Sequence, residues 1–79
     1  MMTRDEALRQ ADERLAPTLS KWHRPHYENY VSGRRVRWED GPLGRTDLME
    51  WMIASLRVRE EIADQIQAEA RQELGEVRR

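Results

Sequence analysis

Residues 46–74 read TDLMEWMIASLRVREEIADQIQAEARQEL, a stretch with no Gly or Pro to interrupt a helix. Asp47 and Glu50 have the spacing of a capping box, whose side chains satisfy backbone amides in the first helical turn. The stretch therefore predicts one long C-terminal helix that begins near Thr46 or Asp47 and meets no helix breaker before Gly75. At about 100° per residue its apolar residues share one sector: Leu48, Met52, Leu56, Ala63, Ile66, Ala70 and Val77.

One charged residue, Arg59, lies near the centre of this sector and divides it in two. A first helix of about 13 residues would be roughly 20 Å long, whereas the C-terminal helix would be about 40 Å long. Half of the longer helix would then lack a partner within the chain, so it should either fray or be covered by another molecule. Its apolar face favours the second outcome. Arg59 itself should either pair with a neighbouring carboxylate or form an ion pair between subunits. The predicted partner or oligomer interface is Arg59, Ile62, Ile66, Ala70, Leu74 and Val77.

The N-terminal segment carries its own start and stop signals. Thr3 and Glu6 have capping-box spacing, so a helix should begin at this point. Pro17 has no amide hydrogen and clashes with the preceding turn, so this helix should stop near Ala16 or kink into a further turn.

The middle of the chain suggests a different structure. Residues 27–31 and 34–38 are rich in β-branched and aromatic side chains, and Ser32 and Gly33 between them suit a tight turn. This pattern predicts a β-hairpin packed on the helices. The predicted fold class is therefore α+β and mostly helical: an N-terminal helix, a hairpin, and a long C-terminal helix antiparallel to the first.

The composition limits the kinds of protein this chain can be. Its 79 residues are 38% hydrophobic and 37% charged, which predicts a single domain with a thin core. We expect a compact core over about residues 2–58 and a helical extension over about residues 59–79. The chain has no Cys, so disulfides and thiolate sites are excluded, and a core this lean often gains stability by oligomerisation. No apolar run is long enough to cross a membrane, and we expect a soluble protein that is not exported.

No combination of residues predicts catalysis, a cofactor or a metal. His23 and His26 lie near Glu28, but their spacing spans a Pro and offers no third strong ligand, so structural roles are favoured. The serines lie outside any nucleophile motif, and the Gly-rich segment at residues 41–46 lacks the Lys of a phosphate loop. We therefore expect a protein that is not an enzyme and has no small-molecule substrate.

A locally basic segment favours contact with nucleic acid or with an acidic surface. The net charge of −1 argues against general attraction to nucleic acid, so we favour protein contact. Two alternatives stay open: a small DNA-binding regulator of phage or mobile-element type, and a small inhibitor or accessory subunit that binds a host protein. The basic residues are Lys21, Arg24, Arg34, Arg35 and Arg37, interleaved with Trp22 and Trp38.

Three short segments resemble a known family. Residues 2–6 (MTRDE) open the first helix, residues 33–36 (GRRV) form the turn and second strand of the predicted hairpin, and residues 46–48 (TDL) open a helix with Ile53 and Leu56. In this order the sequence resembles the gpW family, the small head-completion or head-tail joining proteins of tailed bacteriophages. The resemblance covers roughly residues 2–58.

The resemblance implies two antiparallel helices with an intervening hairpin and a structural role without catalysis. It implies a homo-oligomeric ring under the portal, which completes the filled head and provides the surface for tail attachment. The expected partners are further copies of the chain and a portal or other phage structural protein, close to packaged DNA. The expected location is the virion neck, after assembly in the host cytoplasm.

Overall fold

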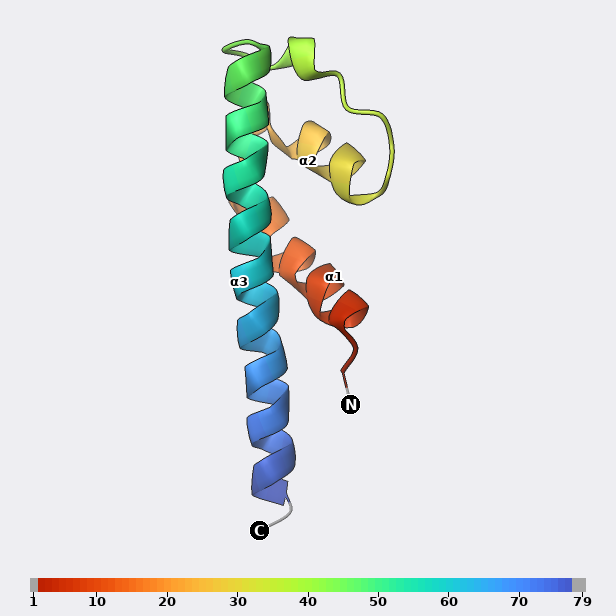
Figure 1. Ribbon diagram of the computed structural model, residues 1–79, viewed down its shortest axis with the longest axis vertical. Coiled ribbons are helices and arrows are strands. Elements are labelled where there is room, and N and C mark those ends of the chain that lie inside the picture. The colour runs from red at the N-terminus through yellow and green to blue at the C-terminus, as the bar shows by residue number, and fades with distance from the viewer. Residues whose placement is uncertain (1, 78–79) are drawn as a thin grey trace.

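The computed structural model describes residues 2–77, and side chains up to residue 73. Within these residues, three α-helices, α1 (Arg4–Leu15), α2 (Arg24–Val31) and α3 (Arg45–Val77), alternate with two short 3-10 helices. These are η1 (Ala16–Thr18) and η2 (Trp38–Asp40). Figure 1 shows α3 as a long rod, with α1 and α2 along the same side of it and a wide loop connecting α2 to η2. No helix within the described residues is long and apolar enough to cross a membrane.

The described residues contain no strand, so the α+β prediction with a β-hairpin is wrong and the fold is all-helical. The first predicted strand, residues 27–31, lies within α2. Pro25 occupies the first turn of α2, where its fixed φ suits a helix and its missing amide hydrogen costs nothing. The weak strand preference of this segment is outweighed by the complete burial of Tyr27, which helical geometry permits.

Gly33 has a backbone conformation that suits both a hairpin turn and the end of a helix, which is why the sequence pattern was misleading at this position. Its φ of +79° is the conformation that a hairpin turn would need, but here it ends a helix. The amide of Gly33 donates to the carbonyl of Tyr30 at 3.2 Å, and that of Arg34 donates to Asn29 at 2.8 Å. These two bonds form a Schellman motif, so Gly33 stops α2 and residues 34–37 continue without regular structure.

The predicted ends of the first helix are confirmed. Thr3 is the N-cap of α1, and its hydroxyl accepts a hydrogen bond from the amide of Glu6 at 3.2 Å. The helix ends at Leu15, and Pro17 lies in the first turn of η1, where a missing amide hydrogen is tolerated. The long helix is confirmed as well, although it begins at Arg45, so Thr46 and Asp47 lie within its first turn.

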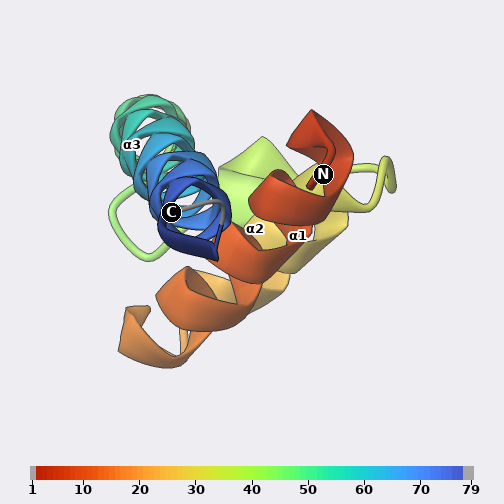
Figure 2. The same cartoon turned by 90° about the horizontal axis from the view of Figure 1, so that it is seen from below.

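Helix α1 lies antiparallel to α3 and crosses its middle (Figures 1 and 2). Arg4, at the start of α1, reaches Gln67, whereas Leu15, at its end, packs with Met52. A cluster of mostly small residues forms the contact: Ala7, Ala11, Ala63 and Ile66. Part of the apolar sector after Arg59 is therefore covered by this chain's own first helix, which corrects the expectation that this half has no internal partner.

The other half of the sector is covered by α2 and the segments around it. Leu15, Tyr27 and Met52 form a second buried cluster, against which Trp38 and Trp51 pack. The loop before α3 packs against Leu48, at the start of that helix. A Cβ atom on Gly41 would come within 2.9 Å of the Leu48 Cβ, so the loop backbone approaches α3 more closely than a side chain would permit.

Candidate functional site

A half-buried polar group joins the three α-helices. Asp12 of α1 accepts three hydrogen bonds through its carboxylate: the Tyr27 hydroxyl donates to Oδ1 at 2.5 Å, and Arg59 donates through Nε to Oδ1 at 2.7 Å and through Nη2 to Oδ2 at 3.1 Å. Tyr27 comes from α2 and Arg59 from α3. We call these three residues the Asp12 clasp. Its charges lie in a region of reduced solvent, where a bidentate pair of this geometry is strong.

The clasp changes the acid–base properties of its members. Burial, together with the hydrogen bond to Asp12, raises the pKa of Tyr27 above its ordinary value, because both oppose formation of a second negative charge. The hydrogen bond to Asp12 also raises the pKa of Arg59. Tyr27 is therefore held as a neutral donor and Arg59 as a cation, and each protonation state matches its bond to the carboxylate.

The sequence predicted one member of the clasp and missed two. Arg59 was expected to pair with a carboxylate or to bridge subunits, and the structure places it in a pair within the chain. Asp12 and Tyr27 carried no signal of their own, since Asp12 resembles the surface acids beside it on α1. An Arg in the centre of an apolar sector was the available clue, because such a charge needs a partner nearby.

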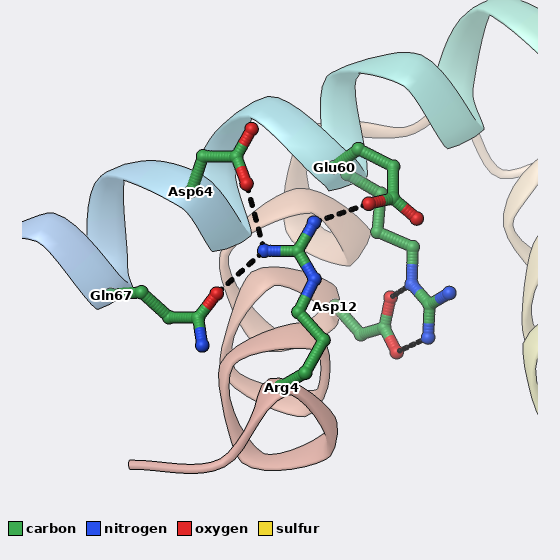
Figure 3. A network of polar contacts seen from close by, with 6 residues as sticks. Arg4, Asp12, Glu60, Asp64 and Gln67 are labelled. Atoms are coloured by element: carbon green, nitrogen blue, oxygen red, sulfur yellow. Dashed lines mark hydrogen bonds and ion pairs between the residues drawn. The ribbon is translucent and has the colours of Figure 1, made fainter. Parts of the chain in front are cut away.

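A second polar group fastens the other end of α1, as Figure 3 shows. The guanidinium of Arg4 forms an ion pair with Glu60, another with Asp64 at 2.8 Å, and a hydrogen bond to the Gln67 side-chain oxygen at 2.7 Å. We call these four residues the Arg4 brace. The brace is solvent-exposed, with 56% of the Glu60 side chain and 70% of the Asp64 side chain accessible, so water screens its charges.

A shallow hollow of about 270 Å³ lies where α1, the end of α2 and α3 meet. We call it the junction hollow. The Asp12–Arg59 pair forms one of its sides, so the clasp is both a structural link and part of a surface. Its lining residues are Asp5, Leu8, Arg9, Asp12, Val31, Ser32 and Arg59.

The described residues of the predicted interface on α3 largely face this chain rather than solvent. Ile66 is buried against Ala7 and Ala11, and Ile62 is half-buried between the two apolar clusters. Ala70 is half-buried as well. The side chains of Leu74 and Val77 lie outside the described residues.

The predicted basic residues have separate roles. Arg24 donates to the carbonyls of Ala16 at 3.0 Å and of Pro17 and Leu19 at 3.4 Å, which stabilises the turn after α1. Arg37 pairs with Asp40 at 3.1 Å. The other three basic residues form no ion pair among the described residues. Lys21 lies over the Trp22 ring, Arg34 donates through Nε to Ser32, and Arg35 is exposed.

Large apolar side chains lie on the outside of the molecule. Leu43 is 79% exposed, Trp22 61% and Ile53 54%. Met49, Ile53 and Val58 are on the first half of α3, while Trp22 and Tyr30 come from the α2 region. Trp22 is adjacent to His23, whose ring stacks on Trp51 with centroids 4.2 Å apart. The exposed apolar side chains therefore concentrate at the end of the molecule that carries α2.

No group of three or more potential metal ligands is present in the part of the chain that the structure describes. His23 bonds through Nδ1 to the Ser20 hydroxyl at 2.9 Å, which satisfies the turn before α2. Comparison with protein-family models, with characterised proteins and with solved structures finds no match to this chain.

Proposed function

We propose that this protein is a non-catalytic interaction module that binds another protein through apolar side chains around α2 and the first half of α3. One observation carries the proposal. Among the described side chains, six large hydrophobic ones are exposed, whereas five are buried: Leu15, Tyr27, Leu48, Met52 and Ile66. A thin core with comparable apolar material outside it is characteristic of a protein that buries part of its surface in a complex.

The position of these side chains narrows the proposed interface. Trp22 is held on a turn by a capping bond from the His23 amide to the Ser20 hydroxyl at 3.2 Å, so its ring is presented on ordered backbone. Ile53 and Met49 lie four residues apart on α3 and therefore share a face. Tryptophan in a desolvated pocket is a frequent centre of binding energy, so Trp22 should contribute most.

The narrower proposal is a structural adaptor in phage particle assembly, forming a ring under the portal that completes the head and receives the tail. Its support is the resemblance at residues 2–6 and 46–48, both of which lie where helices begin. The part of the resemblance at residues 33–36 no longer supports it, because no hairpin forms there. The broader proposal of protein binding does not depend on that part.

The test combines light scattering of the purified chain with copurification against the proteins encoded beside it. We expect self-association or a stoichiometric complex with one neighbour, and portal or capsid genes nearby would favour the narrower proposal. The double variant Trp22→Ser/Ile53→Gln should abolish that association with unchanged helical circular dichroism. Ala68→Gln/Arg71→Gln, on the exposed later part of α3, is the matched control and should bind as the parent does.

A chain that stays monomeric and binds none of these proteins would contradict the proposal. Undiminished association of the Trp22→Ser/Ile53→Gln variant would contradict the location of the interface. Salt-sensitive retention of duplex DNA in place of protein would favour the DNA-binding alternative.

A further inference from the structure

The junction hollow combines an apolar wall with a partly buried cation. Leu8 and Val31 supply apolar surface from α1 and α2, and Arg59 supplies its guanidinium from α3. Only 20% of the Arg59 side chain is exposed, so its charge is largely removed from bulk water. An anion that reached this guanidinium would therefore meet less screening than on an open surface.

Arg59 retains hydrogen-bonding capacity after it has bound Asp12. The bonds to the carboxylate use Nε and Nη2, and Nη1 donates to no described residue. Because an arginine carries five N–H donors in a planar fork, the edge that includes Nη1 is available for a second planar acceptor. Both oxygens of Asp12 are already bonded, and this carboxylate is neutralised by Arg59 itself.

The remaining charges at the hollow limit the size and charge of an anion that could bind there. Arg9 lines it, and the guanidinium of Arg34 is held at its edge by a 3.0 Å bond from Nε to the Ser32 hydroxyl. The lining itself carries two guanidinium groups and two carboxylates, and one of these carboxylates, Asp5, is an exposed residue at the start of α1. Arg34 adds a cation beside the lining, while the nearby Glu60 is paired with Arg4. A lining with nearly balanced charge beside apolar walls suits a single carboxylate better than a polyanion.

We propose that the junction hollow binds an acidic side chain of the partner protein, an Asp or Glu flanked by apolar residues. The carboxylate lies against the free edge of Arg59 and against Arg9, and the flanking apolar side chain packs on Leu8 and Val31. This inference rests on the proposed protein-binding function and names the chemistry that the partner presents. The exposed Tyr30 of the proposed apolar interface precedes Val31 in α2, so this helix contributes to both surfaces.

Two short peptides provide the probe: N-acetyl-Leu-Glu-Leu-amide and its neutral counterpart, in which Gln replaces Glu. In a titration followed by nuclear magnetic resonance, the Glu peptide should shift the Arg59 Nε–H signal and the methyl signals of Leu8 and Val31 in a saturable way. The affinity of the Gln peptide should be lower by a factor of about five or more, since this peptide keeps the shape but loses the charge. Equal affinity of the two peptides would overturn the proposal.

A matched pair of variants locates the site. Arg9 and Arg14 are both exposed arginines of α1, but only Arg9 lines the hollow. Arg9→Gln should weaken binding of the Glu peptide about threefold, whereas Arg14→Gln should leave it unchanged. Equal weakening by both variants would show a general charge effect and contradict a defined site. Tighter binding of short duplex DNA than of the Glu peptide at the same signals would also contradict it.

These outcomes are distinct from failure of the proposed function. If the hollow is wrong but the function is right, the two peptides are not distinguished, while Trp22→Ser/Ile53→Gln still abolishes association with the partner. If the function is wrong, no partner or self-association is found, whatever the peptides do.

Discussion

The two halves of α3 are held to the rest of the chain in different ways. Where α1 crosses it, small side chains let two helix backbones approach closely, and the Arg4 brace fastens the exposed edge. Toward the start of α3, large side chains fill the space under α2, and the Asp12 clasp closes one side. The first contact depends on small side chains that let the helices approach, whereas the second depends on large side chains and a partly buried ion pair.

This difference has a functional consequence. A contact between small residues is complete once the helices meet, and it leaves little apolar surface outside. A contact built from large side chains on a short helix covers α3 only in part, and the exposed Trp22, Tyr30 and Ile53 belong to that region. Binding of another protein in this region would bury these exposed apolar side chains and so enlarge the hydrophobic core.

The largest effect should follow loss of the clasp carboxylate. Asp12→Ala leaves Arg59 as an unpaired cation and Tyr27 without an acceptor. We expect a loss of about 3 kcal/mol in the free energy of unfolding, the lower end for breaking a buried ion pair. The lower end applies because 22% of the Asp12 side chain and 20% of the Arg59 side chain are exposed. Urea unfolding followed by circular dichroism measures it.

The matched control is Asp5→Ala, which removes an exposed carboxylate from the same helix and should change stability by less than about 0.5 kcal/mol. Asp12→Ala/Arg59→Leu should recover part of the loss, since it removes both charges. Equal destabilisation by Asp5→Ala and Asp12→Ala would show that the clasp does not hold the helices together.

The next effect tests the half of α3 that packs on α1. Ala11→Leu adds three carbons where Ala11 and Ala63 are fully buried, so α1 must move away from α3. Overpacking of this kind costs about 2 kcal/mol. Ala68→Leu on the exposed face of α3 adds the same group without contact and should be nearly neutral. If Ala11→Leu were as stable as the parent, the small residues would not set the distance between the helices.

The sequence predicted the helix ends correctly where a single residue, such as a cap or a proline, determines the backbone geometry. Thr3 marked the start of α1 and Pro17 its end, because a cap and a missing amide hydrogen act within one turn. Gly33 was correctly recognised as a position of positive φ, but a hairpin turn and the end of a helix both require that conformation. Local sequence alone could not choose between them, and the burial of Tyr27 decided the outcome.

The contacts of α3 were harder to predict because they join residues far apart in the chain. Helix lengths suggested that half of α3 would be uncovered, but they do not say which half α1 covers. The place where α1 packs on α3 was indicated by the alanines Ala7, Ala11 and Ala63, since small residues permit close packing of two helices. The partner of Arg59 lies 47 residues away, among several acids that look equivalent in the sequence.

A smaller effect separates the hydroxyl of Tyr27 from its ring. Tyr27→Phe keeps the buried ring and removes one of the three hydrogen bonds to Asp12, which should cost about 1 kcal/mol. Tyr30→Phe is the matched control, because Tyr30 is exposed. Its hydroxyl removal should be neutral in the same urea experiment, and a cost equal to that of Tyr27→Phe would contradict a specific role for the clasp hydroxyl.

The same pair of variants tests how the free energy of unfolding depends on alkaline pH. The pKa of Tyr27 is raised in the folded protein, so the folded state keeps the phenol proton at a pH where the unfolded chain loses it. Its contribution is therefore complete below a pH of about 10 and decreases as the pH rises above that value. Tyr30→Phe should retain this decrease, whereas Tyr27→Phe should lose it. Identical alkaline profiles for the two variants would contradict the assigned pKa shift.

The smallest effect should come from the Arg4 brace. Arg4→Gln removes two exposed ion pairs that water already screens, so the urea midpoint should barely move. The first turn of α1 should nevertheless open more often, because it loses its link to Glu60 and Asp64. Amide hydrogen exchange measures this: exchange should accelerate near Ala7 and Leu8 and stay unchanged near Leu15. Added salt should produce the same local acceleration in the parent, since salt screens exposed ion pairs far more than the partly buried pair of the clasp. Acceleration along all of α1 would mean instead that the brace supports the whole contact between α1 and α3. The two halves of α3 would then both depend on ion pairs, and they would differ only in where those pairs lie.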